Sequence, residues 1–178
     1  MSDELSFTGE RFVPGTAGEI WYEHWHRYHF ASRWAAGRRV LDVACGEGYG
    51  SALLARHAAN VVGIDIAQEA IDHARHAYAG VANLEFKRAP CTSLPLADHA
   101  VDLAVSFETL EHIEEQERFL DELKRVLSPE GRFVAYQFRS KVRDFGEPVF
   151  GTRAETHSGF WNVPPMKIYV WRQVESPA

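Results

Sequence analysis

The amino-acid sequence predicts an α/β fold in which a mainly parallel sheet is doubly wound by helices. Short apolar runs alternate with amphipathic segments over residues 38–138, and the first run is followed directly by a glycine-rich turn. Alternating strands and helices form βαβ units, and their right-handed crossovers produce a doubly wound sheet. With 178 residues, of which 46% are hydrophobic and 25% charged, the chain is large enough for one globular domain.

Residues 1–37 are predicted to form an irregular arm followed by a helix that covers the domain. Turn-forming residues without an apolar period occupy the arm, whereas from Glu19 to Gly37 apolar residues recur at spacings of three and four. Three histidines lie in this helix, but only His26 and His29 have the spacing of a metal-binding pair on one helix face. Because no further ligand clusters with them, we expect no metal site.

The segment Val40–Gly50, VLDVACGEGYG, is the first strand, a turn with three glycines, and the start of a helix. In this geometry, backbone N–H groups and a helix N-terminus face a ligand. Glycine suits the turn because it tolerates a positive φ and lets a ligand approach the main chain. The segment therefore predicts a binding site for a nucleotide-like cofactor.

The remaining elements follow in alternation. Strands are predicted at 61–66, 83–87, 101–107 and 132–138, and helices at 51–59, 67–78 and 114–127. The turn Ser128–Gly131 is expected to end the last helix. Residues 139–178 lack a period except at 166–174, where alternation indicates one terminal strand. We therefore expect an arm with a covering helix (1–37), a cofactor-binding core (38–138) and an atypical C-terminal tail (139–178).

Two acidic residues stand at informative positions in the predicted strands. Asp65 ends the second strand, where an acid accepts hydrogen bonds from ribose hydroxyls, and the alternative is a carboxylate that only faces solvent. Asp42 lies in an apolar run, so we expect it to accept from turn amides or to hold a water against the ligand's ammonium group. The turn reads G-x-G-x-G with Ser51 in the sixth position, which disfavours a dinucleotide fingerprint.

These motifs, in this order, resemble the class I S-adenosylmethionine-dependent methyltransferases. The resemblance also covers Glu111-His112 and the segment 123–132, and Thr8–Pro14 with His26-Arg27-Tyr28 resembles a subgroup often associated with glycosyltransferases. It implies S-adenosylmethionine as the cofactor. Where this family often has an acid that binds adenine, the sequence has Ala89-Pro90-Cys91. The cofactor-binding residues that the resemblance and the motifs together indicate are Asp42, Ala44, Cys45, Gly46, Gly48, Gly50, Asp65, Ile66, Cys91, Thr92 and Phe107.

The resemblance implies methyl transfer to a small-molecule acceptor, and an oxygen of a sugar or glycan-linked substrate is the expected site. By position, the candidates for a general base are His112, Glu108 and His29. The family's sheet continues through a long helix and two further strands, a pattern that the tail does not match. The fifth strand would then lack a neighbour, so an inactive, cofactor-binding partner module is an alternative. A nicotinamide-dependent oxidoreductase is a less favoured alternative.

Composition and charge limit the partners. The net charge is −6 and the pI about 5.8, so no basic face indicates nucleic acid or anionic lipid. Neither a membrane span nor a signal peptide is recognisable, and two cysteines indicate reduced thiols. We therefore expect a cytoplasmic protein that acts on a small molecule and that could form a homodimer.

Overall fold

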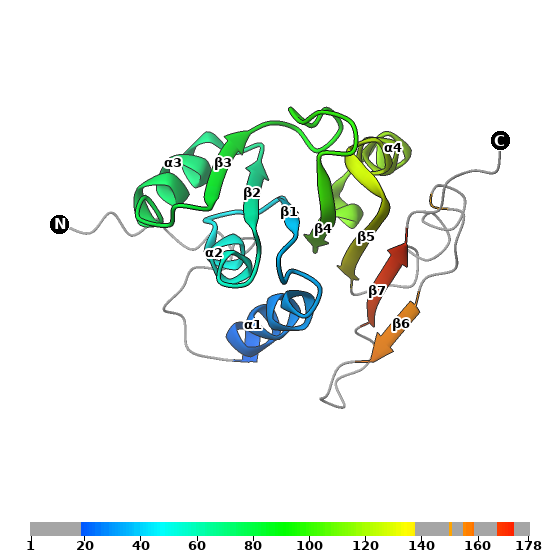
Figure 1. Ribbon diagram of the computed structural model, residues 1–178, viewed down its shortest axis with the longest axis horizontal. Helices are drawn as coiled ribbons and strands as arrows, with labels where there is room; N and C mark the ends of the chain where they lie inside the picture. Colours follow the sequence, from blue (N-terminus) through cyan, green and yellow to red (C-terminus); the bar gives the residue numbers. More distant parts are fainter. Residues whose placement is uncertain (1–18, 138–149, 151–154, 159–166, 173–178) are drawn as a thin grey trace.

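The computed structural model describes residues 19–137, 150, 155–158 and 167–172. Figure 1 shows one twisted sheet with helices on both of its faces. The helices are α1 (Glu19–Ser32), α2 (Tyr49–Ala55), α3 (Gln68–Ala77), the short 3-10 helix η1 (Leu110–His112) and α4 (Gln116–Val126). The strands are β1 (Arg39–Val43), β2 (Asn60–Asp65), β3 (Leu84–Arg88), β4 (Val101–Phe107), β5 (Leu127–Gln137), β6 (Glu155–Ser158) and β7 (Lys167–Arg172).

The seven-stranded sheet has the order β3-β2-β1-β4-β5-β7-β6. The first five strands in the chain pair in parallel, and β7 is antiparallel to both of its neighbours. The predicted doubly wound, mainly parallel sheet is therefore confirmed. The strand order reverses between β1 and β4, and in such folds the crevice at this reversal, beyond the carboxyl ends of the strands, is where ligands bind.

The expectation that the fifth strand lacks a neighbour is wrong. β5 pairs with β7 from Arg132 opposite Arg172 to Gln137 opposite Lys167. The ring of Trp171, which is fully buried, stacks on Phe133 with 5.4 Å between the ring centroids. The strand expected at 166–174 corresponds to β7. β6 was not anticipated, because four residues without an apolar alternation carry no strand signal.

The segment Ser128–Gly131 does not form the predicted turn between helix and strand. β5 already begins at Leu127, which pairs with Val101, and the next matched pair joins Arg132 to Leu103. The four intervening residues form an irregularity in the β4–β5 pairing, which accommodates the missing N–H of Pro129. Leu127 is completely buried, and its place in the core explains why the strand starts there.

The two faces of the sheet carry separate apolar layers. On one face, α4 contributes Phe119, Leu120 and Leu123 to a cluster that includes Leu41. On the other face, α1 and α2 contribute to a second cluster. The layers fix the sheet between them, so the loops at the carboxyl ends of β1, β2 and β4 gather along one edge.

Candidate cofactor site

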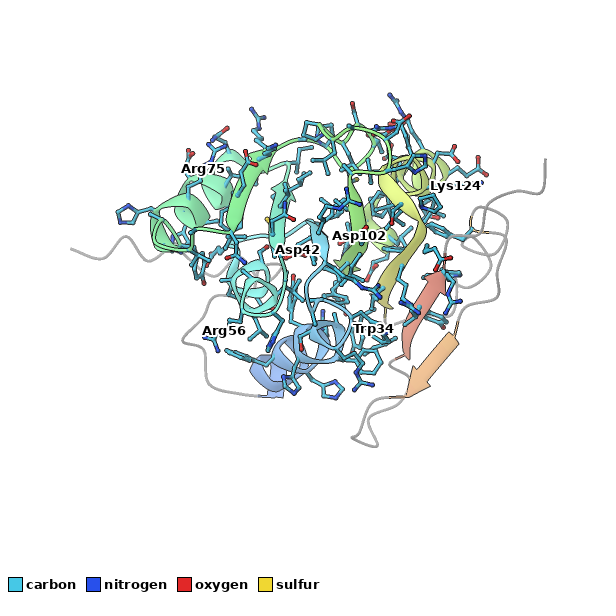
Figure 2. The ribbon with its side chains drawn as sticks, viewed as in Figure 1. Trp34, Asp42, Arg56, Arg75, Asp102 and Lys124 are labelled. Carbon is cyan, nitrogen blue, oxygen red and sulfur yellow. The ribbon has the colours of Figure 1, made fainter. Side chains whose placement is uncertain are left out.

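Asp42 is a buried carboxylate inside β1, at the centre of the molecule (Figure 2). It accepts hydrogen bonds from the Ser51 hydroxyl (2.6 Å) and from the Tyr28 hydroxyl (3.2 Å). Burial raises the pKa of Asp42 to about 7, and these two hydrogen bonds oppose the shift. These partners are two hydroxyls rather than the expected turn amides. The sequence indicated that this acid needs partners, but not that α1 and α2 supply them.

Asp65 is the acid that binds the glycine turn. Its carboxylate accepts from the backbone N–H of Gly46 and from that of Ala67, each at 2.9 Å. An ionised carboxylate has about four acceptor positions, so two backbone donors leave capacity for further donors. Asp65 is only partly buried. This arrangement fits a carboxylate that accepts hydrogen bonds from the hydroxyls of a bound ribose.

The three glycines of the turn are required for different structural reasons. Gly46 has a φ of 53° and open space where a Cβ would stand, so a ligand can approach its main chain. At Gly48, with a φ of 82°, a Cβ would collide with Phe86. At Gly50 it would collide with the ring of Tyr28. The ligand-approach argument therefore applies to Gly46, whereas Gly48 and Gly50 are required by packing.

Ala44 lies just before this open part of the turn, Ile66 follows β2, and Cys91 and Thr92 belong to the loop after β3. Ala44 is exposed and has a φ of 61°, a conformation that favours glycine. Ile66 follows Asp65 and is 65% exposed. Burial raises the pKa of Cys91 and the charge of Asp65 contributes, which indicates that the loop after β3 lies near that acid. Thr92 is partly buried in the same loop. Ile66 thus offers an apolar surface beside the carboxylate.

Two predicted cofactor residues direct their side chains into the core. Cys45 is 3% exposed and packs with Ile71 and Phe86, and burial raises the pKa of its thiol. Phe107 packs edge-on against Tyr28, with 4.9 Å between the ring centroids. Only the main chain of these two residues is available to face a ligand.

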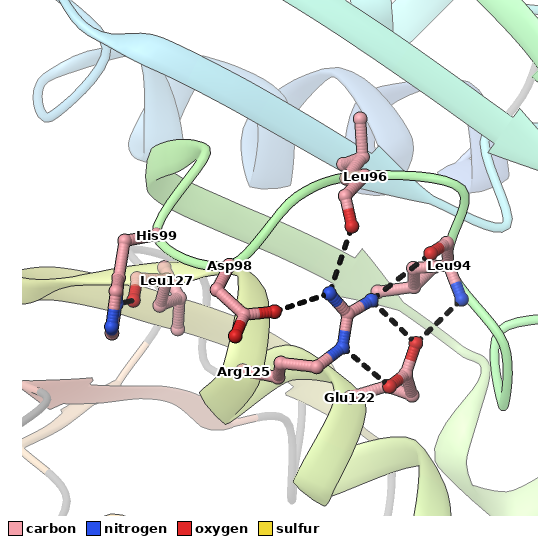
Figure 3. A network of polar contacts seen from close by, with 7 residues as sticks. All are labelled: Leu94, Leu96, Asp98, His99, Glu122, Arg125 and Leu127. Atoms are coloured by element: carbon pink, nitrogen blue, oxygen red, sulfur yellow. Dashed lines mark hydrogen bonds and ion pairs between the residues drawn. The ribbon is translucent and has the colours of Figure 1, made fainter.

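Arg125 and Glu122 of α4 fix the loop after β3 (Figure 3). The Arg125 guanidinium donates to the carbonyls of Leu94 (3.0 Å) and Leu96 (2.8 Å) and to Asp98 (2.9 Å). Glu122 accepts from Arg125 Nε (2.7 Å) and from the Leu94 N–H (2.7 Å). The bonds from Arg125 are the main reason that the pKa of Glu122 lies below its usual value. We call these two residues the loop clamp.

A charged pair lies at the carboxyl ends of β4 and β5. Arg27 of α1 is 3% exposed, and its Nη1 is 3.4 Å from Oε1 of Glu108. The guanidinium carbon stands 4.2 Å from the centroid of the Tyr136 ring. Glu108 directly follows β4 and has a φ of 55°. Sequence reasoning missed Arg27, whose only signal was its place in the motif His26-Arg27-Tyr28.

The three candidates for a general base occupy different environments. His112 is exposed at the end of η1, shortly after β4. Glu108 lies at the end of β4 beside Arg27. His29 is exposed on α1, whereas Tyr28 of the same helix faces the glycine turn. The structure thus places Glu108 and His112 in the segment that follows β4, and His29 on the exposed side of α1.

Within the described residues, no group of three or more His, Cys, Asp or Glu side chains could hold a metal ion. No helix in the same part of the chain is long and apolar enough to cross a membrane.

Comparisons with known proteins agree on one family. Residues 41–135 match the model of the methyltransferase-domain family. A probable S-adenosylmethionine-dependent methyltransferase of Mycolicibacterium smegmatis is 39% identical over 136 residues, which are 75% of this chain and 52% of that protein. A demethylmenaquinone methyltransferase of Clavibacter sepedonicus is 40% identical over 103 residues, 58% of this chain and 42% of that protein. The chain thus spans about half the length of these relatives.

A solved structure supports the fold. The S-adenosylmethionine-dependent methyltransferase of Aquifex aeolicus has a TM-score of 0.68 at 22% identity, covering 79% of this chain and 84% of that one. The cofactor of the family is S-adenosylmethionine, whose adenosine part suits the open capacity of Asp65 and the exposed side chain of Ile66. The chain belongs to the methyltransferase-domain family of class I S-adenosylmethionine-dependent methyltransferases.

Proposed function

We propose that the chain binds S-adenosylmethionine and transfers its methyl group to an oxygen of a small-molecule acceptor. The observation that carries the proposal is the Asp65 carboxylate, which is tied to the Gly46 amide and keeps acceptor capacity open beside the turn. When bound, the cofactor supplies a methyl group on a sulfonium for in-line displacement. The chain's residues hold the reactants in line, an effect worth up to about 7–11 kcal/mol in favourable cases.

His112 is the residue we propose as general base for a hydroxyl acceptor. It is exposed at the end of η1, close in sequence to the end of β4. Glu108 already faces the guanidinium of Arg27, and His29 lies on the outer side of α1. A positioned base contributes typically about 10²–10⁴-fold to the rate.

For the acceptor, we propose a sugar or glycan-linked hydroxyl. The support is the resemblance of Thr8–Pro14 and His26-Arg27-Tyr28 to the subgroup described above. The relatives described above give no support to the glycosyltransferase association of that subgroup. The relative named demethylmenaquinone methyltransferase favours testing quinone precursors as well.

The experiment has a binding arm and a turnover arm. Calorimetry with S-adenosylhomocysteine should show binding, and an absence of binding at millimolar ligand would refute the proposal. Methyl-labelled cofactor is then incubated with sugars, glycolipids and quinone precursors. His112→Asn should lower kcat about 10²-fold or more without changing cofactor affinity, whereas the exposed His76→Asn on α3 should change neither. Binding without turnover of any acceptor would favour the inactive partner module.

A further inference from the structure

The outer edge of β3 has no neighbouring strand among the residues that the structure describes. β3 is the first strand in the sheet order and pairs with β2 alone (Figure 1). Just after β3, the Ala89 N–H donates to the Asp65 carbonyl of β2 at 3.1 Å, so Ala89 faces the inner edge. Because the main-chain groups of successive residues in a strand point to opposite edges, those of Phe86 and Arg88 point outward.

Arg75 of α3 covers the central acceptor of this outer edge. Its Nε and Nη2 both donate to the carbonyl oxygen of Phe86, at 3.1 Å and 2.8 Å. Its Nη1 lies 3.8 Å from the carboxylate of Asp72, one turn earlier in the helix. Open edges of sheets pair readily with other chains, and proteins commonly charge or cover them. Arg75 thus occupies the carbonyl that an added strand at Phe86 would need.

The side chains of β3 are complementary to those of a second, antiparallel β3. In a two-fold pair centred on Phe86, each Phe86 faces the other, and the two residues exchange both of their main-chain hydrogen bonds. Glu85 of each copy then lies opposite Lys87 of the other, and opposite charges in directly facing positions stabilise a strand pair. Within one copy these two side chains already form an ion pair of 3.2 Å. The charges on β3 therefore favour this pairing, and Arg75 is the group that opposes it.

We propose that the outer edge of β3 is a homodimer interface that Arg75 keeps closed. The partner is a second copy of this chain, whose β3 pairs antiparallel across Phe86 when the guanidinium leaves the carbonyl. The facing Glu85 and Lys87 favour a second copy over an unrelated extended segment. Loss of the guanidinium fork should therefore open the edge. The inference does not depend on cofactor binding or on methyl transfer.

Sedimentation equilibrium of the whole chain tests the interface. Arg75→Met should lower the Kd of dimerisation at least about tenfold relative to the wild-type protein. Hydrogen exchange should show that the Phe86 amide becomes protected in the dimer, because it then donates to the other copy. Arg118→Met is the matched control, because Arg118 is also exposed and pairs with an acid three positions earlier, Glu115, at 3.1 Å. This control should leave the Kd unchanged.

Charge reversal on β3 tests the register of the pair. Adding Glu85→Lys to Arg75→Met places like charges opposite each other and should abolish the dimer, and the further change Lys87→Glu should restore it. If Arg75→Met does not fold, Arg75→Gln, which lacks the guanidinium fork, should open the edge in its place. An unchanged Kd in the folded Arg75 variant, or a dimer that Glu85→Lys does not weaken, would overturn the proposal.

Discussion

Two carboxylates, Asp42 of β1 and Glu122 of α4, have pKa values that are shifted in opposite directions. Asp42 is buried against two hydroxyl groups, and burial raises its pKa to about 7. Glu122 lies on α4 against the guanidinium of Arg125, which lowers its pKa. A hydroxyl can donate a hydrogen bond but brings no positive charge, so it does not offset the loss of solvation. Burial sets the sign at Asp42, whereas the bonds from the guanidinium outweigh the weaker effect of burial at the more exposed Glu122.

The glycine turn and the loop after β3 are also held in place by different kinds of interaction. The glycine turn is fixed by close packing of Tyr28 on Gly50 and by buried, uncharged donors. The loop after β3 is fixed by the loop clamp, whose charged groups remain partly exposed. The turn should therefore respond to added volume and the loop to loss of charge.

Gly50→Ala should have the largest effect, because the new methyl group would overlap the Tyr28 ring and displace α1. We expect a loss of about 3 kcal/mol in the free energy of unfolding, at the upper end of the usual cost of overpacking, measured by urea denaturation. The control is Gly80→Ala, where open space surrounds the added atom and a change within about 0.5 kcal/mol is expected. Equal stability of the two variants would show that α1 does not dock through this contact.

Arg125→Met should destabilise the protein by about 2 kcal/mol, because two loop carbonyls and Glu122 lose their donor. It should also raise the Kd of S-adenosylhomocysteine about tenfold if the loop contacts the cofactor. Arg118→Met removes an exposed ion pair with Glu115 on the same helix and should cost about 0.5 kcal/mol or less. If Arg125→Met lowers the stability but leaves the cofactor affinity unchanged, the loop after β3 does not contribute to cofactor binding.

Asp42→Asn should alter how stability depends on pH. The folded protein holds the Asp42 proton up to a pKa of about 7, whereas an unfolded chain releases it near the ordinary value of 3.8. In the wild-type protein, stability should therefore fall as pH rises between these values and level off above them. Relative to the variant, the fall should approach about 1.4 kcal/mol for each pH unit between these two values. The free energies of unfolding of both proteins are measured by urea denaturation. If they change with pH in the same way across that range, Asp42 does not retain its proton in the folded protein.

Ala44→Gly should have the smallest effect and should be stabilising. Ala44 has a φ of 61°, and glycine removes the cost of that conformation while increasing the entropy of the unfolded chain. We expect a net gain of about 0.5–1 kcal/mol by thermal or urea denaturation. Ala52→Gly inside α2 should instead cost about 1 kcal/mol. A loss at both positions would show that the Ala44 conformation is not strained.

Local patterns in the sequence predicted the strands and helices of the core. They also predicted that Asp65 accepts hydrogen bonds from ribose hydroxyls. Apolar runs and helical periods are short-range signals, and an acid at the end of a parallel strand has a position that topology fixes. The same signals predicted the strand at β7 but could not reveal β6. They also suggested a turn at Ser128–Gly131, because proline and glycine do not distinguish a turn from an irregularity inside a strand.

Tertiary structure alone decided which partners the charged groups have. Tyr28 and Ser51 reach Asp42 from two helices, and Arg125 reaches loop carbonyls 29 and 31 positions earlier in the chain. Such partners are chosen by how the helices pack on the sheet, and no local period encodes that choice. Packing also leaves open space beside Gly46 and places the Tyr28 ring of α1 against Gly50. The residues that lie next to a glycine in the folded protein cannot be identified from the residues next to it in the sequence.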